Sequence, residues 1–215
     1  MGAAALLAIG LAGGCRSRAG NAPPAVSRPA PAAPLVAPGT VHLYREVLTL
    51  RVDGRRVCGQ ALYHFRNPEH ALRQVPTALA FHTAGAIGPP RNIRFAHVTA
   101  DTDESLSFAW LEDTRPMVEL TLPAAGRFCL RVDWEQDLRA TQFVYILRRD
   151  PPWKTARESF RLTLYFPRAF RNVRLNYPVT HSFSVDAHQC FVLAAEPFDP
   201  DRDLIVSWEP PQGER

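Results

Sequence analysis

The sequence predicts an all-β fold, an antiparallel β-sandwich that follows an N-terminal segment without regular structure. Two observations support this prediction. Apolar and polar residues alternate along most of the chain beyond residue 41, and turn-forming residues interrupt the alternation at short intervals. Alternation places one row of side chains in a core and the other toward water, because successive side chains of a strand point to opposite faces. We expect about a dozen short strands, in one sandwich or in two smaller stacked ones.

Two apolar rows with a period of two are the clearest strand signals. They are Phe128, Leu130, Val132 and Trp134, and Phe160, Leu162, Leu164 and Phe166. Weaker rows of the same period are Leu106/Phe108/Trp110, Val118/Leu120/Leu122, Phe143/Tyr145/Leu147, Phe183/Val185, Phe191/Leu193 and Leu204/Val206/Trp208. Turn signals such as Pro123, Gly126 and Asp150-Pro151-Pro152 separate the rows. The nearest helix candidate is residues 67–73, where Asn67 can cap a single turn that begins at Pro68.

The N-terminus has the features of a lipoprotein signal, which we place at residues 1–14. Residues 3–12 form an apolar run that is too short to span a bilayer, since a spanning helix needs about 20 residues. The run suits the apolar region of a secretion signal, although the usual positive residues before it are missing. We therefore expect the natural start to lie upstream of Met1. The stretch 11–15 resembles the lipobox of bacterial lipoproteins and predicts lipidation at Cys15; the alternative is a short core helix with a chance cysteine.

Residues 15–40 are predicted to be a disordered tether, because Ala and Pro dominate them and they have little to bury. A tether of about 25 residues could hold the folded part roughly 75 Å from its anchor. The β-sandwich domain is placed at residues 41–210 and a flexible tail at residues 211–215. Arg16, rather than Asp, follows the predicted lipidation site, and by analogy with enteric lipoproteins this favours the outer membrane.

Charge is distributed unevenly along a nearly neutral domain. The formal net charge is +4, but no Asp or Glu precedes residue 41, so the remaining residues carry 22 basic and 21 acidic groups. Overall charge therefore gives no reason to expect a nucleic-acid partner. The segment 148–174 contains eight basic and two acidic residues, whereas the segment 101–119 contains six acidic residues and one Arg.

The basic segment supplies the candidate binding surface. Its residues are Arg148, Arg149, Trp153, Lys154, Arg157 and Arg161. Such a cluster suits an envelope protein, an anionic envelope polymer or lipid headgroups, since each cation near an anionic surface adds about 1 kcal/mol. The alternative is that the acidic and basic segments face each other, or that the charges are scattered over a solvated sheet.

No motif predicts catalysis, a cofactor or a metal. The sequence contains no His-Glu-x-x-His, nucleophile elbow or phosphate loop. His188 and Cys190 share one strand face but have no third ligand nearby in sequence. The run 199–203 has the acid spacing of a calcium loop but lacks the required Gly and Glu, so we expect a polar turn before the last strand.

Three cysteines lie beyond the signal, namely Cys58, Cys129 and Cys190. An odd number permits at most one disulfide, and an oxidising envelope would allow that bond to form. The sequence leaves all three pairings open.

The order of local patterns is similar to the all-β N-terminal domain of aminopeptidase-N-type proteins and to uncharacterised periplasmic proteins. The matching pieces are residues 61–67, residues 143–147 followed by Trp153, and residues 198–204. In those peptidases a separate zinc domain performs catalysis, and these 215 residues contain no counterpart of it. The resemblance therefore implies a scaffold or binding surface. We expect a non-enzymatic, lipid-anchored envelope protein; the alternative is an envelope hydrolase or carbohydrate-active protein with a loop-built site at one end of the sandwich.

Overall fold

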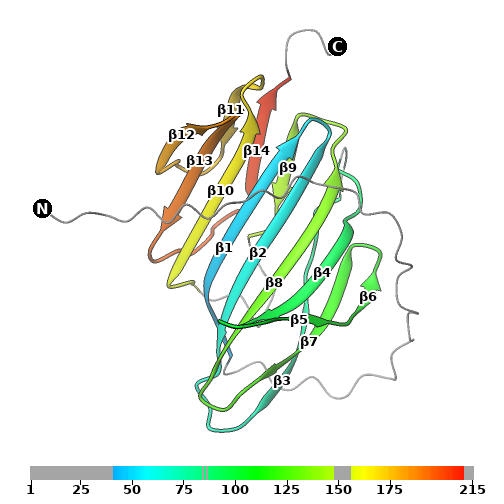
Figure 1. The fold of residues 1–215 in the computed structure, drawn as a ribbon, viewed down its shortest axis with the longest axis vertical. Helices are drawn as coiled ribbons and strands as arrows, with labels where there is room; N and C mark the ends of the chain where they lie inside the picture. The colour runs from blue at the N-terminus through cyan, green and yellow to red at the C-terminus, as the bar shows by residue number, and fades with distance from the viewer. Residues whose placement is uncertain (1–40, 84, 86, 148–155, 211–215) are drawn as a thin grey trace, which may run out of the picture.

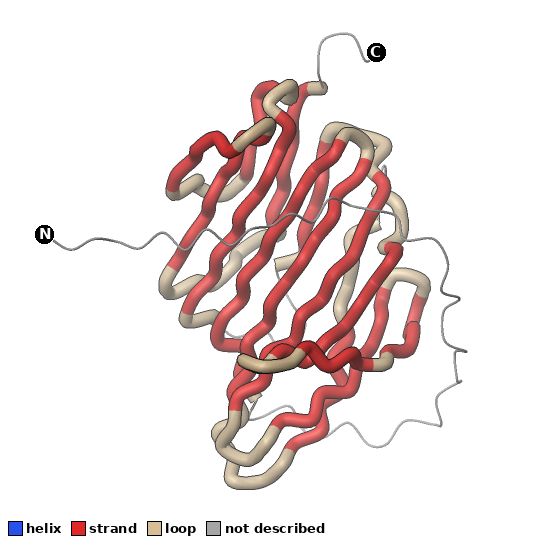
Figure 2. Tube along the Cα trace, in the orientation of Figure 1, coloured by secondary structure: helices blue, strands red, loops and turns tan. Residues whose placement is uncertain are grey.

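A computed structural model describes residues 41–83, 85, 87–147 and 156–210 as an all-β fold. Fourteen strands and no helix occur in this part of the chain (Figure 2). The strands form a large sheet with two three-stranded sheets behind it (Figure 1). The predicted β-sandwich is therefore confirmed.

The large sheet has eight strands. Their spatial order is β12 (His181–Val185), β13 (His188–Ala195), β10 (Ser159–Pro167), β1 (His42–Asp53), β2 (Arg56–Arg66), β8 (Arg127–Asp137), β4 (Arg91–Val98) and β5 (Asp103–Leu106). All neighbouring pairs are antiparallel except β1 and β10, which run parallel from Arg45 opposite Ser159 to Arg51 opposite Tyr165. A hairpin forces its two strands to be antiparallel, but β1 and β10 are far apart in sequence and no such constraint acts on them.

The second layer is divided into two small sheets. One has the order β11 (Arg171–Leu175), β14 (Leu204–Glu209) and β9 (Gln142–Tyr145), and the other the order β3 (Arg73–Ala78), β7 (Arg115–Leu122) and β6 (Phe108–Glu112). The smaller sheets cover one face of the large sheet, which we call its inner face, and leave the outer face toward the viewer of Figure 1.

The two strongest apolar rows are buried in the core, as predicted. The row of β8 and the row of β10 are both buried, with Leu130 and Leu164 fully inaccessible. Gly59 on β2 lies directly beneath the Trp134 indole, and a Cβ at Gly59 would lie 2.2 Å from that ring. The Trp134 side chain therefore fits only because its cross-strand neighbour, Gly59, has no side chain.

Two of the weaker rows differ from the prediction. The row that includes Leu106 and Phe108 is interrupted at Ser107, and its halves become β5 and β6 in different sheets. The row of Phe183 and Val185 is not buried: these side chains are 46% and 43% exposed. The reason is the register: Phe183 of the edge strand β12 is aligned with Cys190 of β13, and both side chains lie on the outer face of the sheet.

The helix candidate at residues 67–73 is a bend between β2 and β3, in line with the expected single turn. Buried Asn67 organises it, because its side-chain oxygen accepts a hydrogen bond from the Glu69 amide at 3.1 Å. Its side-chain nitrogen donates to the carbonyls of Ala71 and Pro123, both at 2.9 Å. Within the described ranges, no segment qualifies as a membrane-crossing helix.

Candidate binding surface

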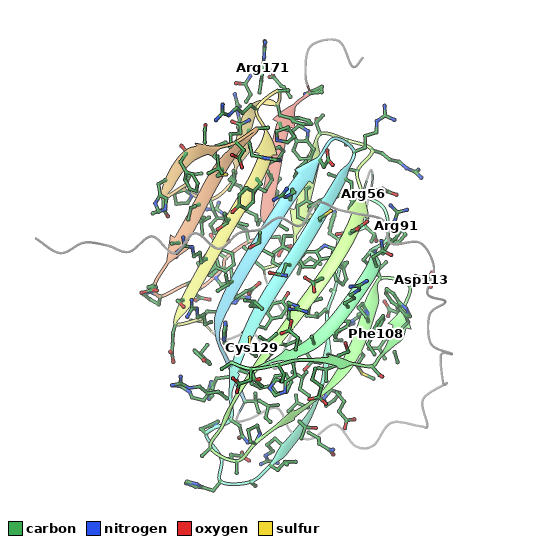
Figure 3. The ribbon with its side chains drawn as sticks, in the orientation of Figure 1. Arg56, Arg91, Phe108, Asp113, Cys129 and Arg171 are labelled. Carbon is green, nitrogen blue, oxygen red and sulfur yellow. The ribbon has the colours of Figure 1, made fainter. Side chains whose placement is uncertain are left out.

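The outer face of the large sheet carries many charged side chains, and it divides into two halves. Over β2, β8 and β4 several charges are paired: Arg56 lies 3.3 Å from a Glu135 oxygen and 3.6 Å from an Asp137 oxygen. Arg91 from β4 contacts the same Asp137 carboxylate. Figure 3 shows Arg56 and Arg91 at the same end of the sheet.

A second paired group lies further along β8 and includes β5. Arg131 contacts Asp103 of β5, and its Nε lies 3.1 Å from an Asp133 oxygen. Partial burial acts to lower the pKa of Arg131, but the hydrogen bonds and charges of Asp103 and Asp133 outweigh it and raise that pKa. Gln60 of β2 donates a hydrogen bond to Asp133 at 2.8 Å. This half of the outer face is thus electrostatically balanced.

The other half, over β1 and β10, is basic and not balanced. Arg45, Arg51 and Arg161 point outward, because the residues beside them in each strand are buried in the core. Within the described residues, none of the three has a carboxylate within ion-pair distance. The Arg51 guanidinium lies over the Tyr165 ring, 5.5 Å from its centre. We call Arg45, Arg51 and Arg161 the basic face.

The positive potential of the basic face acts on its neighbours. Arg45 is paired in register with His64 of β2. Burial, followed by the Arg45 charge, lowers the pKa of His64. Burial raises the pKa of the Cys129 thiol, and Arg45 acts against that rise. Arg45 therefore influences two strands beyond its own.

A bulge at Tyr44 fixes further cations beside the basic face. The register of β1 and β2 shifts between Leu43 and Arg45. The ring of Tyr44 has the guanidinium groups of Arg66 and Arg127 at 5.6 and 5.7 Å from its centre. Arg66 is also paired with a Glu158 oxygen at 2.8 Å. Cation–π contacts of this kind orient arginine side chains that remain in contact with water.

The structure tests only part of the predicted binding surface. Cys15, Arg148, Arg149, Trp153 and Lys154 lie outside the described residues. Arg161 is exposed and belongs to the basic face.

Arg157 does not lie on the surface, so its place in the predicted binding surface was wrong. Arg157 is 1% exposed, and its Nε lies 2.8 Å from an Oε of Glu46. Its Nη2 donates to the Leu147 carbonyl at 3.0 Å. Backbone hydrogen bonds to Phe198 hold Arg157 between the layers of the sandwich.

Glu46 is the centre of a buried polar network that sequence reasoning missed. The Tyr145 hydroxyl donates to Glu46 at 2.7 Å, and the Tyr63 and Tyr145 hydroxyls are 2.7 Å apart. The available signal was the position of Glu46 in the strand, since it occupies the same parity as the apolar residues Leu48 and Leu50. A carboxylate in an apolar row requires a buried partner.

A small hollow lies beside this network, with room for about one water molecule. Tyr63, Val132 and Trp134 of the large sheet line it, together with residues 79–82 and 143–146. The side chain of Gln136 closes one side by donating to the carbonyls of His82 and Gly88, both at 3.0 Å. Its lining is mainly aromatic and aliphatic, and it is much smaller than the pockets that enclose small-molecule ligands.

Cys58, Cys129 and Cys190 form no disulfide within the described residues. Cys58 lies opposite Glu135 and Cys129 opposite His64, so they are six residue positions apart along paired strands. This separation is about 20 Å, well beyond the 7 Å limit between Cα atoms for a disulfide. His188 and Cys190 do share one face of β13, but no group of three metal-binding side chains occurs in the described ranges.

Comparison with known proteins relates the fold to two groups of solved structures. A proposed nutrient-binding protein of Legionella pneumophila matches 81% of this chain and 68% of its own, with a TM-score of 0.60 and 10% identity. An M1 zinc metallopeptidase of Deinococcus radiodurans matches 78% of this chain with a TM-score of 0.52, also at 10% identity. This chain spans 42% of the metallopeptidase.

No protein-family model matches the sequence, and no curated protein matches it significantly. At such low identity the structural likeness is one of fold alone. The chain is therefore an all-β sandwich similar in fold to the β-domain of M1 aminopeptidases and to the Legionella protein.

Proposed function

We propose that this chain is a lipid-anchored protein of the bacterial cell envelope, and that its sandwich acts as a non-enzymatic binding module. The observation that carries the proposal is the basic face. Arg45, Arg51 and Arg161 point outward from two adjacent strands and have no carboxylate partner in the described part of the chain. Charged groups left unpaired on a rigid sheet are preorganised for an anionic partner, because their positions need not change on binding.

Burial and charge assign separate roles to the two faces of the large sheet. The inner face packs against the smaller sheets and encloses the buried Glu46–Arg157 pair. The outer face is where a partner can make contact. Its paired half, around Arg131, presents little net charge, whereas its basic face presents three cations. Binding is therefore assigned to the half over β1 and β10.

The fold likeness to a proposed nutrient-binding protein agrees with a binding role. The internal hollow is too small for a nutrient-sized ligand. We therefore place recognition on the outer surface of the sheet. A partner that carries phosphate or carboxylate groups has the complementary charge.

Anchoring rests on the lipobox-like stretch that ends at Cys15, and Arg16 after it favours the outer membrane. Replacement of Cys15 by Ser removes the acyl acceptor. We expect the wild-type chain in the membrane fraction and the C15S chain in the soluble fraction. Equal incorporation of labelled fatty acid into the wild-type and C15S chains would refute lipid anchoring.

Binding is tested with poly-L-glutamate as an anionic probe and the C15S chain. The variant Arg45→Gln/Arg161→Gln removes two cations of the basic face. Its matched control is Arg55→Gln/Arg139→Gln, which removes two exposed cations from turns at the other end of the sheet. We expect salt-sensitive binding that the first pair weakens and the second leaves nearly unchanged. Equal loss in both variants would show that only net charge matters and would reject the basic face as a site.

A further inference from the structure

The basic face is continuous with an exposed apolar edge. The register aligns Phe183 of β12 with Cys190, Cys190 with Tyr165, and Tyr165 with Arg51. These four residues therefore form one row across the outer face. With strands about 4.8 Å apart, Phe183 and Arg51 are separated by about 14 Å. Phe183 and Val185 remain 46% and 43% exposed.

The two edges of the large sheet have opposite character. The edge strand β5 carries Asp103 and Glu104, and Asp103 is paired with Arg131. All five residues of the edge strand β12 are exposed, and none of them is Asp, Glu, Lys or Arg. The outer face thus runs from a charge-balanced half to a half that combines unpaired arginines with exposed apolar side chains.

We propose that this half of the outer face docks on an anionic bilayer surface. Arg45, Arg51 and Arg161 lie at the level of the lipid phosphates, and Phe183 and Val185 enter the boundary between headgroups and acyl chains. The inference rests on the proposed function, because it names the partner that the basic face binds. Charge complementarity selects an anionic partner, and the adjoining apolar edge favours a bilayer over a soluble polyanion, since only the bilayer offers apolar contact beside its charges.

The lipid anchor makes such a contact effective even if it is weak. An anchored domain stays near the membrane, so its docking becomes an intramolecular step. Each arginine near an anionic leaflet contributes about fivefold in affinity. A domain with this surface would lie against the bilayer with β1 and β10 toward the lipid and the smaller sheets toward the aqueous side.

The test uses the C15S chain and sedimentation with vesicles. One set of vesicles contains phosphatidylglycerol and phosphatidylethanolamine, and the other contains phosphatidylcholine alone. Any background from the apolar residues 3–12 is common to all variants, so conclusions are drawn from differences between variants. Circular dichroism of each variant first verifies that it is folded.

We expect preferential binding to the anionic vesicles. The Arg45→Gln/Arg161→Gln variant should bind about 25-fold more weakly, whereas Arg55→Gln/Arg139→Gln should change the affinity less than about threefold. The Phe183→Ser/Val185→Ser variant should lose about fivefold in affinity, and this loss should persist at high salt because it reflects apolar contact. Leu111→Ser is the matched control, since Leu111 is 51% exposed on β6 of a different sheet.

Four outcomes would overturn the inference. Equal binding of all variants, or equal binding to both vesicle types, would exclude this face as the membrane contact. Binding to poly-L-glutamate that depends on Arg45 and Arg161, without any preference for anionic vesicles, would reject the bilayer and leave the proposed function intact. A vesicle-independent dimer that Phe183→Ser/Val185→Ser abolishes would identify a second copy as the occupant of the edge. Failure to bind either probe would instead count against the proposed function itself.

Discussion

The buried pair of Glu46 and Arg157 allows a quantitative prediction. Glu46 is fully inaccessible, Arg157 is 1% exposed, and the pair is joined at 2.8 Å. Replacement of Arg157 by Met removes this cation from the carboxylate and also the hydrogen bond to the Leu147 carbonyl. Breaking a buried pair from one side costs about 3–5 kcal/mol, because the remaining charge cannot regain its hydration. We therefore expect Arg157→Met to lower the free energy of unfolding by about 3–5 kcal/mol.

The double variant Glu46→Leu/Arg157→Met separates the pair from simple packing. A buried ion pair replaced by apolar side chains of similar size often leaves stability nearly unchanged. The loss of the Tyr145 hydrogen bond to Glu46 adds about 1–3 kcal/mol, since that hydroxyl stays buried. The double variant should consequently be no less stable than Arg157→Met alone. Denaturant unfolding followed by tryptophan fluorescence measures both quantities. A loss below about 1 kcal/mol in Arg157→Met, or a double variant that is less stable than Arg157→Met, would refute the reasoning.

Three further predictions concern packing and titration. Gly59→Ala should destabilise the fold by about 1–3 kcal/mol, because the added Cβ would overlap the Trp134 indole. Gly88→Ala should have little effect, since the nearest contact of its Cβ would be 3.4 Å away. The denaturant midpoints of the two variants distinguish these outcomes. His64 has a lowered pKa in the folded state, so the unfolded chain takes up a proton first as the pH falls below about 6.5, and the stability of the fold decreases there. The His64→Gln variant should flatten this part of the curve of stability against pH, and an unchanged curve would contradict the assignment. Burial raises the pKa of the Cys190 thiol, so a thiol reagent should modify Cys190 in the native protein more slowly than after unfolding, and equal rates would show that Cys190 is accessible.

The apolar rows predicted the sandwich because burial on one face imposes a period of two. The rows of β8 and β10 lie on interior strands of the large sheet, where both neighbours and the second layer fix the inward side. The same period was misleading at Phe183, because alternation alone does not state which face is covered. Only the register with β13 places Phe183 outward.

The candidate site was less predictable than the fold. Arg161 and Arg157 are four residues apart and look alike in the sequence, yet one is exposed on β10 and the other is enclosed by Glu46 and Phe198. The contribution of Arg45 was also invisible, because it depends on the parallel pairing of β1 and β10. Long-range pairing of this kind joins segments more than 100 residues apart, and no local pattern specifies it.

The most direct test of the account maps the bound surface residue by residue. Backbone amide chemical shifts of the unacylated C15S chain are followed by NMR during titration with poly-L-glutamate. We expect the largest changes around Arg45, Arg51 and Arg161 on β1 and β10. Changes concentrated instead around Trp134 and Tyr145 at the hollow, or around Arg131 on the charge-balanced half, would contradict the assignment of binding to the basic face.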